Sequence, residues 1–207
     1  LNRVFLTLFL IFFLAGAILD MNLLFAIGWV FLVKAMPIEE PSSSELAKLL
    51  VIPFFGFPWV SFDANGIGWT FRLTGAQVTA QLFSLLNFNV IQEGTQLLIN
   101  KLPISVEAAC AGLNTLQSMM ILGLTLAYMD LKHSILYWFN IPLLLFIAWI
   151  ANTIRIIMIS SMALYGGREF ALGPLHSIGG LAVIFIMFML AWGLIKLQKE
   201  FLCAKSR

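Results

Sequence analysis

Long hydrophobic runs, separated by short polar segments, occupy most of the chain. The clearest run begins after Glu107 and continues without a charged residue to Met129, which gives about 20 apolar residues, the length that crosses a bilayer as a helix. Two similar runs cover residues 135–164 and 175–197. The pattern predicts three consecutive transmembrane helices in the second half of the chain.

The first 65 residues divide less clearly. Residues 4–36 are almost entirely apolar, and as one helix they would extend about 50 Å, well beyond a hydrocarbon core. They form either a hairpin broken near Asp20 or one long protruding helix. Residues 37–50 indicate an exposed linker that leads into a short helix, and residues 51–62, rich in aromatic residues and prolines, indicate an interfacial segment, a re-entrant segment or a short span.

A more polar region precedes Glu107. Residues 75–86 alternate polar and apolar side chains, which predicts a short amphipathic helix on the membrane surface. Residues 89–100 consist of two short β-type runs separated by Glu93 and Gly94, which predicts a small hairpin. The predicted fold class is therefore an all-α polytopic membrane protein, a bundle of about 4–6 transmembrane helices, with a small outward-facing β-hairpin and amphipathic region.

We interpret the whole chain, residues 1–207, as a single membrane domain with four parts. These are N-terminal spans with an interfacial segment in residues 1–65, an outer-face amphipathic helix and hairpin in residues 66–106, a three-span catalytic core in residues 107–197, and a cytoplasmic tail in residues 198–207.

Composition supports the membrane interpretation and excludes other classes. The chain is 61% hydrophobic and 11% charged, with a mean hydropathy of +0.97, values that a water-soluble domain of this size does not reach. A net charge of +2 with scattered basic residues argues against nucleic-acid binding. No cofactor and no metal are expected, and membrane lipids are the expected surroundings.

Positive charges predict the orientation, because short cytoplasmic loops and tails collect Lys and Arg. The basic C-terminal tail is therefore inside, and counting back puts residues 165–174 outside, Lys132 inside, and residues 70–106 outside with the Glu107 end of its helix. Cys110 and Cys203 then lie on opposite sides of the bilayer, which excludes a disulfide between them. The expected location is the inner (cytoplasmic) membrane of the cell, with several spans.

Arg155 is the most unusual residue of the apolar runs. An arginine near the middle of a membrane helix costs about 2.5 to 3.5 kcal/mol on insertion scales, so it needs a partner or a water-filled cavity. The alternative is a side chain that extends along the helix to the outer surface. Asn152, three residues earlier, shares a helix face with Arg155 and could orient its guanidinium, or it could form an ordinary interhelical hydrogen bond.

Cys110 is expected in the first turn of the helix entered through Glu107, where unpaired N–H groups and the helix dipole favour a thiolate. Alternatively, it is one of several small residues that let another helix approach closely. His176 opens the last apolar run and, taken alone, is an interfacial histidine. Together with Arg155, the three types suit a nucleophile, an acid–base group and an oxyanion donor, all at the outer face.

These residues lie within motifs that resemble the exosortase and archaeosortase family over residues 75–195. The matching pieces are Glu93 with Gly94, VEAACAGLN at residues 106–114, ANTIR at residues 151–155, and LHSIGG from Leu175. Many members have Ser after the cysteine and Arg four residues after it, where this chain has Ala111 and Asn114. These departures indicate a subfamily with a different substrate signal, and the short N-terminal region indicates a compact member.

The resemblance implies a membrane cysteine transpeptidase or protease that recognises a C-terminal sorting signal on exported proteins. In the family the signal is a short Pro-containing motif, a transmembrane helix and a basic cluster, and an unknown glycan or lipid is the expected acceptor. The family triad falls on Cys110, Arg155 and His176, with Asn152, Glu107 and Asn114 as supporting residues. A membrane transporter and a non-catalytic scaffold of a polysaccharide export system are the alternatives.

Overall fold

The computed structural model describes residues 2–36, 42–59, 65–105, 113–167 and 174–205. The chain separates into two compact units: unit 1 contains Leu1–Asn65, Gln117–Leu144 and Trp192–Arg207, and unit 2 contains Gly66–Leu116 and Leu145–Ala191. Helices α6 (Leu113–Leu131), α7 (Leu136–Gly166) and α9 (Pro174–Lys205) each contribute several residues to both units.

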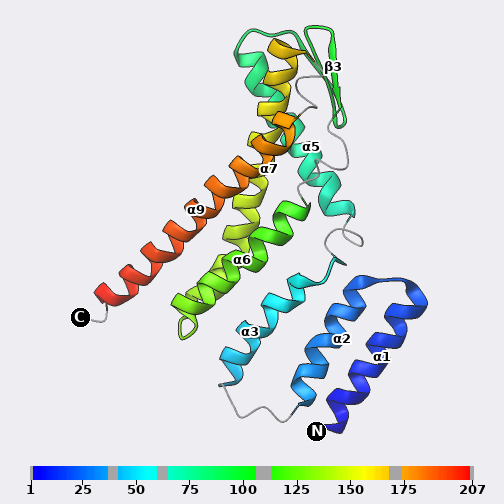
Figure 1. Ribbon diagram of the computed structural model, residues 1–207, viewed down its shortest axis with the longest axis vertical. Coiled ribbons are helices and arrows are strands. Elements are labelled where there is room, and N and C mark those ends of the chain that lie inside the picture. Colours follow the sequence, from blue (N-terminus) through cyan, green and yellow to red (C-terminus); the bar gives the residue numbers. More distant parts are fainter. Residues whose placement is uncertain (1, 37–41, 60–64, 106–112, 168–173, 206–207) are drawn as a thin grey trace. The chain divides into compact units, whose positions relative to one another are not determined.

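In unit 1, the first two helices form an antiparallel hairpin (Figure 1). Helix α1 (Arg3–Leu19) ends at Asp20, whose φ of 52° gives the left-handed conformation that stops a helix, and α2 (Asn22–Ala35) follows directly. At the open end, the N–H of Asn2 donates to the carbonyl O of Ala35 at 3.0 Å. Of the two predicted alternatives for this stretch, the structure shows the hairpin broken at Asp20.

Helix α3 (Ser43–Gly56) is tied to the turn between α6 and α7 by a buried lysine. Lys48 is only 3% exposed, and its Nζ donates to the carbonyl O of Lys132 at 2.6 Å and of Ser134 at 3.0 Å. The hydroxyl of Tyr137 in turn donates to the carbonyl O of Lys48 at 2.7 Å. A charged donor on these carbonyls stabilises the C-terminal end of α6, where unpaired C=O groups gather.

The other end of α3 is tied to the beginning of α6. Nε2 of Gln117 donates to the carbonyl O of Phe55 and of Phe57, each at 3.1 Å. With Lys48 at the opposite end of α3, these bonds make α3 and α6 antiparallel neighbours. Residues 51–56 are therefore part of helix α3, and the three interpretations of residues 51–62, an interfacial segment, a re-entrant segment or a short span, stay predictions.

Charged side chains gather at the Lys48 end of unit 1. The carboxylate of Asp130 pairs with Nζ of Lys196 at 2.9 Å and with Nζ of Lys199 at 2.6 Å. Nδ1 of His133 lies 2.7 Å from Oε1 of Glu45. The beginning of α3, the α6–α7 turn and the last part of α9 thus meet at one end of this unit.

In unit 2, helix α5 (Asn65–Leu85) packs against α7. It begins well before the predicted start at Gly75, and Gly75 marks the contact, since a Cβ there would lie 2.8 Å from Cδ1 of Ile156. Nε1 of Trp149 donates to Oγ1 of Thr74 at 2.8 Å in the same region. The amphipathic pattern therefore reflects one face of α5 buried against α7.

A three-stranded antiparallel sheet follows α5, with the order β1 (Val90–Glu93), β2 (Gln96–Ile99) and β3 (Leu102–Ser105). The first two strands occupy the stretch for which the sequence predicts a hairpin, and β3 is an addition. Asn100 and Lys101, between β2 and β3, have φ values of 50° and 70°, as a two-residue type I′ turn requires.

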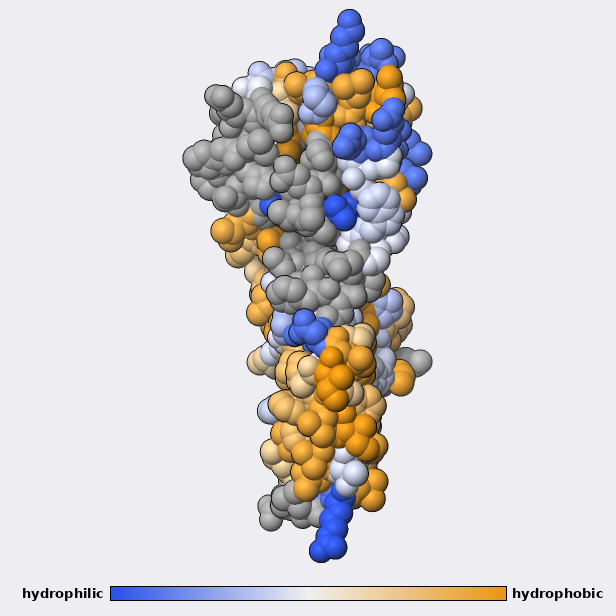
Figure 2. Space-filling model, turned by 90° about the vertical axis from the view of Figure 1, so that its right-hand side faces the viewer, coloured by the Kyte–Doolittle hydropathy of each residue, from blue (hydrophilic) through white to orange (hydrophobic). Residues whose placement is uncertain are grey.

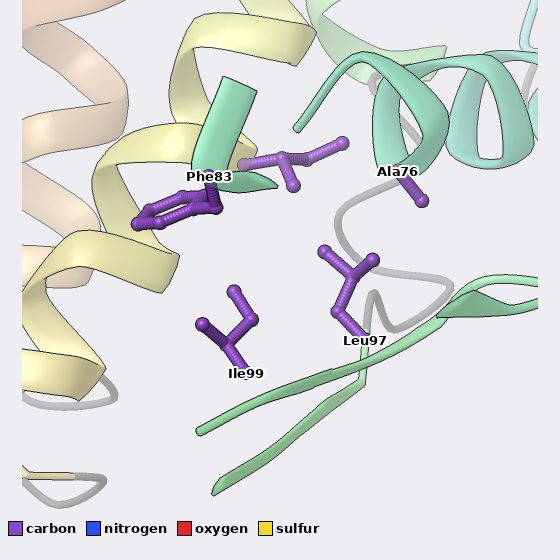
Figure 3. Close-up of a cluster of buried hydrophobic side chains, with 5 residues drawn as sticks. Ala76, Phe83, Leu97 and Ile99 are labelled. Carbon is purple, nitrogen blue, oxygen red and sulfur yellow. The ribbon is translucent and has the colours of Figure 1, made fainter. Parts of the chain in front are cut away.

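The sheet covers α5 through a small hydrophobic cluster (Figure 3). Leu97 and Ile99 are two residues apart on β2, so both side chains point to the same face, toward Phe83 and Ala76 of α5. Ile156 of α7 completes the cluster. α5, β2 and α7 therefore share one core within unit 2.

Two of the described helices are long and apolar enough to cross a membrane by length and composition, Leu136–Gly166 and Leu181–Ala204. Shorter apolar helices cover Arg3–Leu19, Asn22–Ala35 and Leu116–Leu131. Large apolar side chains on these helices are exposed, and Figure 2 shows patches of hydrophobic residues beside hydrophilic ones on the face drawn. Contiguous apolar surface of this kind suits contact with lipid.

Gly123 tests the α6–α7 contact in unit 1. A Cβ at Gly123 would meet Leu144, with Cδ1 at 2.7 Å and Cγ at 3.1 Å, and Leu144 is fully buried. Gly123→Ala should lower the free energy of unfolding by about 1–3 kcal/mol, the usual cost of overpacking. Thermal unfolding in detergent measures the change.

Gly193→Ala is the matched control, because a Cβ at Gly193 meets nothing within 4 Å and alanine favours a helix. Equal unfolding temperatures for the two variants would show that α6 and α7 do not approach at Gly123.

Candidate functional site

Two of the six predicted site residues have described side chains, Arg155 and Asn152, and both lie on α7. Cys110 and Glu107 lie outside the described residues. Asn114 and His176 lie in the first turns of α6 and α9, but their side chains are outside the described part. The proximity of Cys110, Arg155 and His176 therefore stays a prediction.

Arg155 packs within unit 2 rather than extending fully into solvent. The residue is half-buried, and its Nε is closed off from solvent. An arginine that only reaches the membrane surface would hold its charged head in water. Burial of Nε places this atom among protein groups, and a functional role for Arg155 stays a prediction.

Asn152 is 2% exposed, and both polar atoms of its side chain, Nδ2 and Oδ1, are buried. Neither atom has a hydrogen-bond partner in the part of the chain that the structure describes. The structure thus shows neither the predicted hydrogen bond to Arg155 nor the alternative bond to another helix. A buried carboxamide in this state is uncommon, because burying a polar group without a partner costs free energy.

Contacts on one side of α7 determine which way Arg155 and Asn152 face. Trp149 and Ile156 lie toward α5: Trp149 donates to Thr74, and Ile156 contacts Gly75. At about 100° per residue, Asn152 and Arg155 lie about 60° apart, and Arg155 is the more remote from the α5 side. The two polar residues therefore occupy the flank of α7 next to its α5 contact.

The described chain on either side of Cys110 is regular. Strand β3 ends at Ser105, and α6 begins at Leu113. Cys110 lies between these two elements in the sequence, and its predicted place in a first helical turn lies outside the described residues.

The sequence analysis did not single out Lys48, Gln117 or Trp149, which make the interhelical hydrogen bonds described above. The available signal was their chemical type, since polar side chains within apolar helices commonly bond between helices. Within the described ranges, no group of three or more His, Cys, Asp or Glu residues could hold a metal ion.

Comparison with known proteins identifies the family. The family model described as transmembrane exosortase matches residues 2–193, nearly the entire chain. No curated protein and no solved structure matches the chain. With apolar helices of membrane-spanning length and a match that includes the segments of Cys110, Arg155 and His176, this membrane protein belongs to the transmembrane exosortase family.

Proposed function

We propose that the chain is an intramembrane cysteine transpeptidase or protease, which cleaves the C-terminal sorting signal of exported proteins and transfers the product to a surface acceptor. Membership of the exosortase family supports the reaction class. The observation that carries the proposal on this chain is Arg155, a partly buried arginine with a buried Nε inside an apolar helix. A group so costly to insert is retained where it performs a task.

In the proposed reaction, Sγ of Cys110 attacks a backbone carbonyl of the substrate as a thiolate. Arg155 donates to the oxyanion of the tetrahedral intermediate, and its positive charge also favours the thiolate. When the C–N bond breaks, His176 gives a proton to the leaving amine, and a thioester to Cys110 remains.

Release of the thioester completes the cycle. Neutral His176 accepts a proton from the attacking acceptor, an amine on a glycan or lipid, or water when no acceptor is bound. The new C–N or C–O bond forms as the C–S bond breaks, and Sγ of Cys110 leaves as the thiolate. No cofactor or metal takes part in these steps.

The proposed orientation places the Lys48 end of unit 1 in the cytoplasm. The basic residues Lys132, Lys196 and Lys199 gather there, as the positive-inside rule requires of a cytoplasmic end. Residues 90–105, which form the sheet, and the active site then face the periplasm, and the substrate helix lies in the membrane beside the chain.

The reaction is tested by processing of a reporter that ends in a proline-containing motif, a transmembrane helix and a basic cluster from an exported protein of the same genome. Cys110→Ala should abolish processing, and Arg155→Lys should lower its rate about 100-fold or more, since an ammonium cannot reproduce the planar fork of donors. His176→Ala should lower the rate of processing by a similar factor. Immunoblots of the reporter measure the rates.

Cys203→Ala is the matched control, because it removes the other cysteine of the chain, an exposed thiol near the C-terminus, and should leave processing unchanged. Processing that persists in Cys110→Ala would make the nucleophile assignment wrong and favour a transporter or a scaffold.

Orientation is tested with a membrane-impermeant maleimide on intact cells. All variants carry Cys110→Ala, which removes the thiol that the proposed reaction places at the outer face. In this background Cys203 should stay unlabelled until the inner membrane is permeabilised, whereas Lys101→Cys with Cys203→Ser should be labelled from outside. Both positions are exposed, so the membrane and not burial decides the result. Labelling of Lys132→Cys from outside would contradict the orientation.

A further inference from the structure

Helix α7 buries two polar side chains whose polar atoms make no hydrogen bond to any residue in the described part of the chain. They are Asn152, with Nδ2 and Oδ1, and Ser160, with Oγ. The residues are 2% and 0% exposed. Each burial opposes folding, because the group gives up its bonds to water and gains none in return.

The two residues lie in different surroundings. Helical spacing places Ser160 between Ile157 and Leu164, which pack against the cluster of α5 and the sheet. Asn152 lies instead on the flank shared with Arg155. Only Asn152 is therefore next to the residue that the proposed reaction uses.

We propose that the carboxamide of Asn152 binds the main-chain N–H and C=O groups of one substrate residue next to the scissile bond. The inference rests on the proposed function and adds a substrate-positioning residue to it. In the substrate-free protein the carboxamide has no partner among the described residues, and the substrate supplies the missing donor and acceptor.

The chemistry of the side chain favours a peptide group. A carboxamide presents one acceptor and one N–H donor side by side, which is the complement of the C=O and N–H groups of an extended chain. A phosphate or carboxylate would bond to Nδ2 and leave Oδ1 buried without a donor. Since both Nδ2 and Oδ1 lack a partner among the described residues, the expected ligand carries a hydrogen-bond acceptor and a hydrogen-bond donor.

The substrate also has backbone groups that need hydrogen-bond partners. For Sγ of Cys110 to reach a carbonyl carbon, the substrate must leave its helical conformation at that point, and this frees backbone N–H and C=O groups. Within an apolar environment such groups need partners from the protein. Asn152 satisfies one such pair, and binding relieves the unpaired state on both sides.

This arrangement predicts opposite effects on stability and on substrate binding. Asn152→Leu replaces the carboxamide by an apolar group of similar size, so it should raise the unfolding temperature of the substrate-free protein in detergent. The same variant should raise the apparent KM for the reporter about ten- to a hundredfold, as expected from two lost hydrogen bonds, with a smaller change in kcat.

Ser160→Ala is the matched control, because it also removes a buried polar group of α7, but on the α5 side. It should not lower the unfolding temperature, and its KM should equal that of the wild type. Asn152→Ala is the second variant: it leaves a space that lowers stability, yet its KM should rise as in Asn152→Leu.

Three outcomes would overturn the inference. A lower unfolding temperature for Asn152→Leu would show that the carboxamide has a partner in the resting protein. An unchanged KM in both Asn152 variants would show that the substrate does not use it, and an equal rise in KM for Ser160→Ala would show a general effect of packing. In each case, loss of processing in Cys110→Ala would leave the proposed function intact, whereas its persistence would refute that function directly.

Discussion

Polar groups inside an apolar environment must find partners, and this constraint organises much of the described structure. Lys48 satisfies it with the carbonyl groups of the α6–α7 turn, and Gln117 with those at the end of α3. Trp149 satisfies it with Thr74 of α5. Each of these bonds links segments that are distant in the sequence, whereas buried Thr79 bonds to the carbonyl O of Gly75 in its own helix.

Asn152 is informative because it departs from this rule on the same helix that obeys it at Trp149. A carboxamide that is buried without a partner among the described residues costs free energy that is large beside the about 5–15 kcal/mol net stability of a typical domain, which favours a compensating use. Such locally unfavourable groups usually occur at functional sites. A side chain that is already hydrogen-bonded in the substrate-free protein gains little free energy when it bonds to a substrate. The position next to Arg155 fits that explanation.

The sequence predicts well those features that depend on local pattern. The three apolar runs correspond to α6, α7 and α9, and the break at Asp20 follows from a run too long for one span. Strand β3 was missed because its turn uses Lys101 at a position where glycine is the usual signal, although Asn100 fits the turn well. The beginning of α5 was missed because its first residues carry no amphipathic period.

The pattern of hydrophobic and polar residues did not predict features that depend on contacts between distant parts of the chain. The predicted parts are contiguous segments, whereas units 1 and 2 interleave along α6, α7 and α9. The packing of α3 along α6 depends on Lys48 and Gln117, whose partners are 60 or more residues away. For the site, residue type and motif spacing were sufficient to name Arg155, but the unpaired state of Asn152 is a property of its surroundings and has no signature in the sequence.

The three candidate catalytic residues are predicted on three different apolar runs of the sequence, so the proposed reaction would depend on the register between the helices of those runs. In unit 1, Asp130 of α6 pairs with Lys196 and Lys199 of α9, and Nδ2 of Asn140 on α7 donates to Oε1 of Gln198 on α9 at 3.0 Å. A slip of one residue along any of these helices would shift its side chains by about 1.5 Å and rotate them by about 100°. Such a change exceeds the tolerance of a hydrogen-bonded proton transfer, so the proposed reaction would also require polar bonds that touch no substrate.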